Sequence, residues 1–343
     1  MGAAFRESVS RVLGAFARPF YGGIGCILCF HRVLPEEQRS TFPDNRALEI
    51  TPEDLRAILA WVKKRRLEPI ALDAVPERLA SPGGRKFIAF TFDDGYRDNL
   101  VHALPIFREF GMPFAVNVTT GFIDGSEPAW WYALEKVLGI LETISGKDGG
   151  RDFSYTLDTP AARHAALETL GRVVRGLGPG RRTEFIHDLC TATGVDAWRT
   201  TRNMMMTREE LRQLAADELV TIGAHTAAHY SLNRLSEDEA RQEMLRAKSD
   251  LETLLARPVN HFAYPFGGRN AVGAREFQLA KECGFITAVT TRSANLFPQH
   301  AAHLDCLPRL GVSGNYPAVA RLRKLESGLA TALEGKGRRV VVE

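Results

Sequence analysis

The chain carries several short apolar runs, and most of them are followed by amphipathic segments with helical spacing. A run in which successive residues are all apolar is typical of a strand that is covered on both faces. Helix-capping residues begin three of the amphipathic segments, at Thr51, Thr207 and Ser236. This alternation predicts parallel strands joined by helical crossovers, and therefore an α/β fold. The predicted strands are residues 24–30, 86–92, 113–118, 219–224, 261–266, 285–290 and 306–312.

From residue 127 to residue 203 the pattern changes, because we find no strand and apolar residues recur at helical spacing. This segment is predicted to be either a small helical domain or a long helical insertion between two strands. After the last predicted strand, residues 326–343 end in GKGRRVVVE, which predicts a frayed basic tail. The apolar positions of the 127–203 segment are Trp131, Leu134, Leu138 and Leu141, followed by Leu167, Leu170, Val174 and Leu177.

Residues 1–20 have the pattern of an amphipathic helix, with apolar residues at helical spacing beside three arginines. One interpretation is a surface helix docked on the core, and another is a helix that makes peripheral contact with a membrane. The arginines interrupt any continuous apolar run, so the segment does not resemble a secretory signal. The apolar positions are Phe5, Val9, Val12, Phe16 and Phe20, and the arginines are Arg6, Arg11 and Arg18.

Composition narrows the class of protein. The formal net charge of the 343 residues is +3, with both signs scattered, which argues against a nucleic-acid partner. No apolar stretch approaches the roughly 20 residues that cross a bilayer. The five cysteines are scattered and odd in number, unlike a disulfide framework. Cys26 and Cys29 should point to opposite faces of one strand and be buried there. We therefore expect a cytoplasmic protein, or one at the inner face of the membrane.

Four of the predicted strands end in polar or ring-bearing residues, at His31, Asp93-Asp94-Gly95, His225 to His229, and Pro265-Phe266. In a β/α barrel the loops at the carboxyl ends of the strands converge, so these residues are expected to meet. Each group also has a simpler explanation when taken alone. Adjacent aspartates before a glycine often form only a turn, and histidines four residues apart often share only a helix face.

Two imidazoles and one carboxylate make a set of three ligands that leaves positions open on a metal ion, as catalytic sites do. The second aspartate would then be free to act as a general base. A bound metal ion would polarise the bond under attack. The residues alone therefore predict metal-assisted hydrolysis. The ligand set suits Zn²⁺ best in our interpretation, although Co²⁺ and Ni²⁺ also fit.

Three segments, in order, resemble the first motifs of the NodB-type polysaccharide deacetylases. They are TFDDGY (91–96), HTAAH (225–229) and YPFG (264–267). The resemblance extends over residues 24–312, with the 127–203 segment outside the shared motifs. It implies a distorted (β/α) barrel of about seven strands and a metal-dependent hydrolase that removes N- or O-acetyl groups from carbohydrates.

The resemblance also implies a role for each matching residue. Asp93 would be the general base, and Asp94, His225 and His229 would hold the metal. Thr226 would fix the orientation of the ligand loop. The segment Tyr264-Pro265-Phe266 would bind substrate, with the N–H of Phe266 helping to hold the oxyanion.

The chain departs from the family pattern at two places. Ala263 stands where the family usually has an arginine that braces the base, and residues 307–312 lack the usual histidine acid. We infer that Arg309 braces Asp93 and that His31 serves as the acid. The simpler alternatives are a structural ion pair for Arg309 and a hydrogen-bonded strand-end histidine for His31. His261 and His303 are further acid candidates.

Three functions remain open from the sequence. The first is an N-deacetylase acting on an N-acetylated amino sugar in an oligosaccharide, polysaccharide or lipid-linked glycan. The second is an O-deacetylase or an amide hydrolase of non-sugar C–N bonds, and the third is a glycan-binding barrel whose chemistry has decayed. The adjacent residues Trp130 and Trp131 either stack on sugar rings or pack a helix onto the core. Because Asp94 and His225 must share one metal, we predict one catalytic domain at 21–325, with an insertion at about 127–203.

Overall fold

The computed structural model describes residues 13–14 and 16–342 of the chain. Residues 1–12, which hold most of the predicted N-terminal helix, lie outside the described residues. Of that helix, residues 16–21 are helical, and both Phe16 (74% exposed) and Phe20 (58% exposed) face solvent. The expectation that these two side chains dock on the core is therefore wrong. In the described part of the chain, no helix is both long enough and apolar enough to span a membrane.

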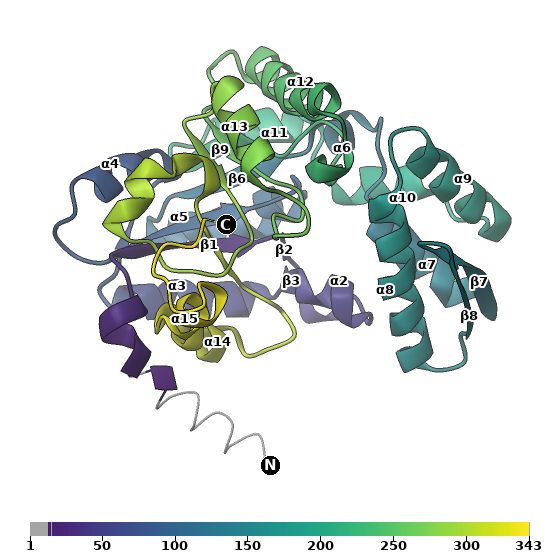
Figure 1. Cartoon of the computed structure of the whole chain (residues 1–343), viewed down its shortest axis with the longest axis horizontal. Helices are drawn as coiled ribbons and strands as arrows, with labels where there is room; N and C mark the ends of the chain where they lie inside the picture. The colour runs from purple at the N-terminus through teal and green to yellow at the C-terminus, as the bar shows by residue number, and fades with distance from the viewer. Residues whose placement is uncertain (1–12, 15, 343) are drawn as a thin grey trace.

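The described residues form a barrel of seven parallel strands in the order β1, β5, β6, β9, β10, β11, β12 (Figure 1). Strand β12 pairs with β1, and a bridge between Val289 of β11 and Leu307 joins β11 to the chain that leads into β12. The predicted distorted (β/α) barrel is confirmed. Its strands are β1 (Gly25–Phe30), β5 (Phe87–Phe92), β6 (Phe114–Val118), β9 (Val220–Ala224), β10 (His261–Ala263), β11 (Thr287–Val289) and β12 (Leu310–Gly311), and β4 (Glu68–Pro69) also pairs with β5.

Helices cover the outside of the barrel, and a small parallel pair, β2 with β3, lies beside its first strand. The helices around the barrel are α3 (Pro52–Lys64), α4 (Val75–Ala80), α5 (Leu104–Phe110), α6 (Thr120–Asp124), α11 (Arg208–Ala215), α12 (Glu237–Leu255), α13 (Ala274–Glu282), α14 (Ala318–Glu326) and α15 (Leu329–Glu334). The segment after β1 contains β2 (Arg32–Val33), α2 (Pro43–Ala47) and β3 (Glu49–Ile50). Short helical turns lie at Glu36–Gln38, Leu72–Ala74, Asn99–Ala103, Leu232–Arg234, Pro298–Ala302 and Leu304–Cys306.

The apolar runs form strands because both of their faces are covered. Every residue of β1 and β5 is buried. Side chains alternate along a strand, so Cys26 and Leu28 of β1 pack under the outer helices while Ile27 faces the barrel interior. Cys29 also points inward, away from Cys26, and all five cysteines are free, as expected.

Helix starts were predictable from local chemistry. Thr51, Thr207 and Ser236 each form a capping box. In each box the hydroxyl accepts from the backbone N–H three residues later, and the acidic side chain of that later residue accepts from the backbone N–H of the capping residue. Strand ends were less predictable. The strand expected at residues 261–266 ends at Ala263, because the chain turns through Pro265 and a left-handed Phe266 (φ +62°).

The segment after α6 projects from one side of the barrel (Figure 1). It was predicted to be helical throughout, and this is wrong, because an antiparallel hairpin lies between two of its helices. The glycine pair Gly149-Gly150, with positive φ at both residues, makes the two-residue turn that such hairpins favour. The elements are α7 (Trp130–Ile140), β7 (Thr143–Asp148), β8 (Arg151–Thr156), α8 (Pro160–Gly176), α9 (Arg181–Thr193) and α10 (Ala197–Met204).

The end of the chain is not a frayed tail, contrary to the prediction. Helix α15 follows α14 directly, and Glu326, Thr331 and Val341 are all buried. Glu326 forms ion pairs with Arg18 and Lys86. These contacts attach residues 326–342 to the end of the barrel at which β5 begins. The basic residues after 335 therefore belong to a packed segment.

Candidate active site

The carboxyl ends of the barrel strands bring most of the predicted polar residues together. His31 follows β1, Asp93 and Asp94 follow β5, and His225 follows β9. Arg309 comes from the chain just before β12. This is the end at which loops from separate strands of a β/α barrel converge.

Asp93 is buried and held by three side chains. Arg309 donates to both carboxylate oxygens, at 2.8 Å from Nη1 to Oδ1 and 2.6 Å from Nη2 to Oδ2. Asn117 Nδ2 donates to Oδ1 at 2.9 Å, and the Cys29 thiol lies 3.5 Å from Oδ2. Burial raises the pKa of Asp93, but the Arg309 charge, the Arg309 hydrogen bonds and the neighbouring imidazoles of His225 and His31 together outweigh burial and hold the pKa well below its usual range. Asp93 is therefore an ionised carboxylate with a fixed orientation.

Arg309 is itself fully buried and fixed by the barrel wall. Its Nε donates to the carbonyl of Thr290 at 3.0 Å, and its Nη1 also donates to Thr91 Oγ1 at 3.0 Å. The inward position on β10 where the family usually has an arginine is the small Ala263. The guanidinium thus reaches Asp93 from β12, and the contact that we inferred from the sequence is present.

Asp94, His225 and His229 converge beside Asp93. The Nε2 atoms of His225 and His229 lie 3.4 Å and 3.3 Å from Asp94 Oδ1. His225 Nδ1 lies 2.7 Å from the carbonyl oxygen of Ala263, so this nitrogen carries the proton and leaves Nε2 as an acceptor. That tautomer is the one a metal ligand needs.

The three residues fit a divalent cation. Asp94 Oδ1 is buried and has no hydrogen-bond partner among the described residues. One carboxylate oxygen and two imidazole nitrogens, whose donor atoms lie within 4.8 Å of one another, are ligands that Zn²⁺ accepts. A bound cation would satisfy this oxygen, which lacks a hydrogen bond among the described residues.

The ligand loop has an unusual backbone. Thr226 and His229 both adopt positive φ, at +65° and +56°, a conformation that costs energy for residues other than glycine. Thr226 Oγ1 accepts from the N–H of His229 at 2.9 Å. Thr226 thus closes the loop from within and connects the two histidines.

The side chains of residues 264–266 lie on two different sides of the sheet. Phe266 lies at the site, with its ring 4.9 Å from the ring of His229, and its N–H has no partner among the described residues. Pro265 makes the turn that places this N–H. Tyr264 is not at the site, contrary to the prediction, because side chains alternate along the strand and its ring points outward. Its hydroxyl donates to the carbonyl of Asp305.

His31 is half-buried and lies in one cluster with Cys29 and Asp93, whose donor atoms are within 4.8 Å of one another. Burial lowers the pKa of His31, and the negative charges of Asp94 and Asp93 offset this lowering only in part. The carbonyl of His31 accepts from Asn99 Nδ2 at 2.9 Å. The other histidine candidate at a barrel strand, His261, begins β10 at the opposite end and contacts Asp73 and Thr287, so it cannot serve as the acid.

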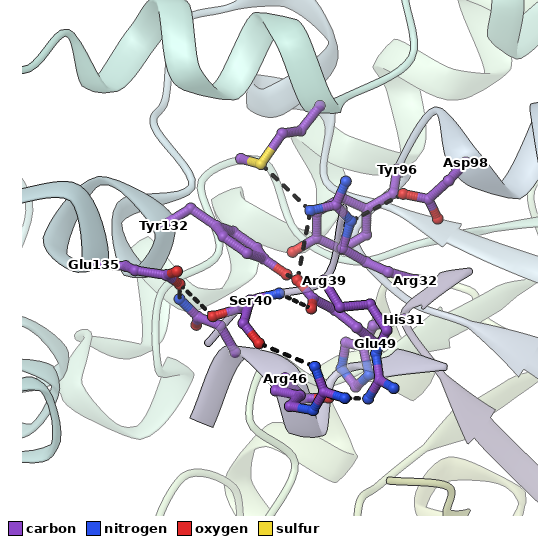
Figure 2. Close-up of polar contacts among 12 residues, drawn as sticks. His31, Arg32, Arg39, Ser40, Arg46, Glu49, Tyr96, Asp98, Tyr132 and Glu135 are labelled. Carbon is purple, nitrogen blue, oxygen red and sulfur yellow. Dashed lines mark hydrogen bonds and ion pairs between the residues drawn. The ribbon is translucent and has the colours of Figure 1, made fainter. Parts of the chain in front are cut away.

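A buried polar network holds the chain that follows His31 (Figure 2). Arg32 donates to Asp98 at 2.9 Å and lies against the rings of Tyr96 and Tyr132. Tyr132 of α7 donates to Glu49 of β3 at 2.7 Å. The network therefore ties His31 to the DDGY segment and to the projecting segment at the same time.

Aromatic rings form the wall beside His229. The ring of Trp131 lies 5.0 Å from the His229 ring, and its Nε1 donates to the Tyr96 hydroxyl at 3.1 Å. Phe122 stacks at 5.7 Å. Trp130 and Trp131 are both buried, so the packing interpretation of this pair describes the structure.

Two residues around Asp93 were not predicted to belong to the site. Asn117 is a polar residue inside the otherwise apolar strand β6, and this pattern was the signal that could have found it. Cys29 was expected only to be buried. Burial raises the pKa of its thiol far above the usual value, so it stays protonated and can donate to Asp93.

The sequence matches a family model described as polysaccharide deacetylase over residues 80–138 and 179–288, which contain Asp93, Asp94, His225 and His229. The chain belongs to the polysaccharide deacetylase family. It is therefore a hydrolase of the deacetylase type, and the NodB-type resemblance is confirmed. Residues 139–178, from the end of α7 to the start of the α8–α9 turn, lie outside the matched segments.

Solved structures share the fold of this deacetylase. A deacetylase of Streptococcus pyogenes, PplD, is 17% identical with a TM-score of 0.56, covering 88% of this chain and 97% of its own. IcaB from Ammonifex degensii is 17% identical with a TM-score of 0.55 and the same two coverages. The BpsB deacetylase domain from Bordetella bronchiseptica is 17% identical with a TM-score of 0.52, covering 83% and 94%. No curated protein sequence matches the chain.

Proposed function

We propose that the protein is a metal-dependent hydrolase that removes N-acetyl groups from an N-acetylated amino sugar in an oligosaccharide, polysaccharide or lipid-linked glycan. The observation that supports this most is the buried Asp94 oxygen, which makes no hydrogen bond among the described residues and lies between two histidine nitrogens, directly beside a carboxylate that Arg309 helps to keep ionised. The near-neutral charge of the chain suits a substrate without strong charge.

Asp94, His225 and His229 would hold the cation, with Zn²⁺ favoured and Co²⁺ or Ni²⁺ also acceptable. When bound, such an ion lowers the pKa of water and polarises a carbonyl group. The ring of Phe266 lies beside the ring of His229, and its N–H, which has no partner among the described residues, would donate to the oxyanion that forms on the acetyl carbonyl.

Asp93 would accept the proton of the attacking water, and His31 would give a proton to the departing amine. The lowered pKa of His31 means that the ring starts neutral near pH 7 and must gain this proton during the reaction. The donor atoms of His31 and Asp93 lie within 4.8 Å, so one water molecule can link them. The proton taken by Asp93 can then reach the amine through His31.

Acetate release from chitooligosaccharides and peptidoglycan fragments tests the proposal. We expect release that EDTA abolishes and added Zn²⁺ restores. Asp93→Asn should lower turnover by about 10²–10⁴-fold because it removes the general base. His31→Ala should lower it while metal binding is kept.

Other outcomes would favour the other functions. Release only from O-acetylated sugars or from non-sugar amides would indicate the second function and contradict N-deacetylation of sugars. Metal binding without release from any acylated substrate would indicate a decayed, glycan-binding barrel.

We also propose that residues 1–20 contact an anionic membrane surface. Leu13, Phe16 and Phe20 are at least half exposed and fall on one helical face. Arg18 lies on the opposite side of this helix, where it pairs with Glu326, and Arg6 and Arg11 precede these apolar residues in the sequence. Exposed apolar side chains next to arginines are the pattern of a helix that binds at a lipid headgroup layer.

A further inference from the structure

Arg182, near the start of α9, reaches the loop that carries His229. Its Nη2 donates to the carbonyl of Ala228 at 2.6 Å, and its Nη1 donates to the carbonyl of His229 at 3.2 Å. Only 3% of the residue is exposed. An arginine from the segment that projects beside the barrel thus contacts the backbone of a proposed metal ligand.

The two carbonyl oxygens depend on this arginine. The residues described in the structure offer neither oxygen another hydrogen-bond donor. A buried carbonyl without a partner is costly. The other half of the loop is fixed differently, because the N–H groups of Ala227 and Ala228 donate to Glu243 of α12. Arg182 therefore restrains the carbonyl side of the loop at the strained His229 (φ +56°).

The guanidinium is itself fixed in position. Its centre lies 3.5 Å from the ring centroid of Tyr230, and Nη2 also pairs with Glu127 Oε2 at 2.8 Å. Stacking on an aromatic face while donating from two nitrogens is a geometry that arginine can adopt and lysine cannot. The residue is held from three directions and transmits that position to the loop.

We infer that Arg182 is a positioning residue that holds His229 in the orientation needed to bind the metal. This inference rests on the proposed metal site formed by Asp94, His225 and His229. It also gives the start of α9 a role in the active site. Substitutions of groups that orient metal ligands typically weaken metal affinity by about 10–100-fold.

The test is the affinity of the metal-free protein for Zn²⁺ and Co²⁺, measured by competition with a chelator. We expect Arg182→Gln to bind both ions about 10–100-fold more weakly than the wild type. The absorption spectrum of bound Co²⁺ should change, because the spectrum reports ligand geometry. Arg199→Gln is the matched control, since Arg199 is 70% exposed on α10, and it should bind like the wild type.

Two further variants separate positioning from general stability. Arg182→Lys keeps the positive charge but loses the planar guanidinium with its several N–H donors, so its metal affinity should stay low. Metal affinity equal to that of the wild type would overturn the inference. Glu127→Gln keeps Arg182 and removes the negative charge of one of its partners, so metal affinity is expected to fall by a few-fold. This variant decides the matter if Arg182→Gln does not fold, and wild-type affinity in it would then count against the inference.

Failure of the proposed function gives a different result. If the wild-type protein binds neither ion tightly, both the metal site and the role of Arg182 are wrong. If the wild type binds tightly and Arg182→Gln binds equally well with an unchanged Co²⁺ spectrum, only the role of Arg182 is wrong.

Discussion

The ion pair between Asp93 and Arg309 combines two charges that are both almost fully buried. Removing one partner of such a pair leaves an uncompensated charge, which is far more costly than the loss of an exposed ion pair. Asn117 and Cys29 add hydrogen-bond donors around the same carboxylate. The arrangement keeps Asp93 ionised and oriented in a place where an isolated carboxylate would be protonated.

Arg309→Gln should shift the pH dependence of the reaction. Arg309 lowers the pKa of Asp93 against the raising effect of burial, so without it the pKa should rise above its usual range. As the proposed general base, Asp93 acts only when ionised, so the acid limb of kcat/KM should move up by about 1–3 pH units. The profile from pH 4 to 9 measures this shift.

Arg309→Lys keeps a positive charge, so it should move the acid limb of kcat/KM less than Arg309→Gln does. Circular dichroism of both variants checks that they are folded. An acid limb at the wild-type position in folded Arg309→Gln would contradict the bracing role.

At the residue scale, the sequence predicted site residues best where a reactive side chain follows a predicted strand. Asp93, Asp94, His225 and His229 each follow a predicted strand, and they meet. Tyr264 was misplaced because the motif does not say which side of the strand each residue faces. Nothing in the sequence around Arg182 predicts that it lies near the site, because its contacts depend on how α9 lies against the barrel.

At the scale of elements, β6 and β9 pack tightly enough to position Asn117. Gly223 of β9 pairs with Asn117, and a methyl group added at Gly223 would overlap the side-chain oxygen of Asn117. It would also lie 3.1 Å from the carbonyl oxygen of His261. The glycine therefore leaves the space in which Asn117 donates to Asp93.

Gly223→Ala should lower both activity and stability. The added methyl group displaces Asn117 from Asp93, and overpacking of this kind costs about 1–3 kcal/mol. Turnover and the midpoint of urea unfolding measure the two effects, and metal affinity should be retained.

Gly139→Ala is the control, because no atom lies within 4 Å of a methyl group at that position in α7. It should be neutral or slightly stabilising. Wild-type turnover in Gly223→Ala would show that Asn117 does not depend on this space.

Strands and capped helices were predictable as elements because each follows from local patterns, as with β5 and the helix that Thr51 caps. The hairpin of β7 and β8 was missed because both strands are largely exposed, so no apolar run marks them. The packing of residues 326–342 was missed for another reason. Their partners, such as Arg18 and Lys86, lie near the start of the chain.

At the scale of the whole molecule, the helix before the barrel presents apolar side chains to solvent. Phe16→Ser combined with Phe20→Ser should reduce flotation with vesicles that contain phosphatidylglycerol, because the apolar area that enters the headgroup layer is lost. Vesicles of phosphatidylcholine alone should bind the wild type more weakly, since they do not attract the arginines.

Val101→Ser combined with Ile286→Ser is the control pair. Both residues are 51% exposed but lie elsewhere on the molecule. Equal flotation of the wild type and the Phe16/Phe20 variant would contradict membrane contact through this helix.

The pairing of β1 with β12 joins residues from the two ends of the chain, Leu28 with Leu310. Arg309 and Asp93 are likewise separated by 216 positions. A nascent chain emerging from the ribosome therefore holds Asp93 for most of its synthesis without the cation that compensates it. Contacts of such long sequence separation also form slowly. Barrel closure and the pairing of Asp93 with Arg309 therefore become one late event, so an incompletely synthesised chain cannot bury Asp93 as a compensated carboxylate.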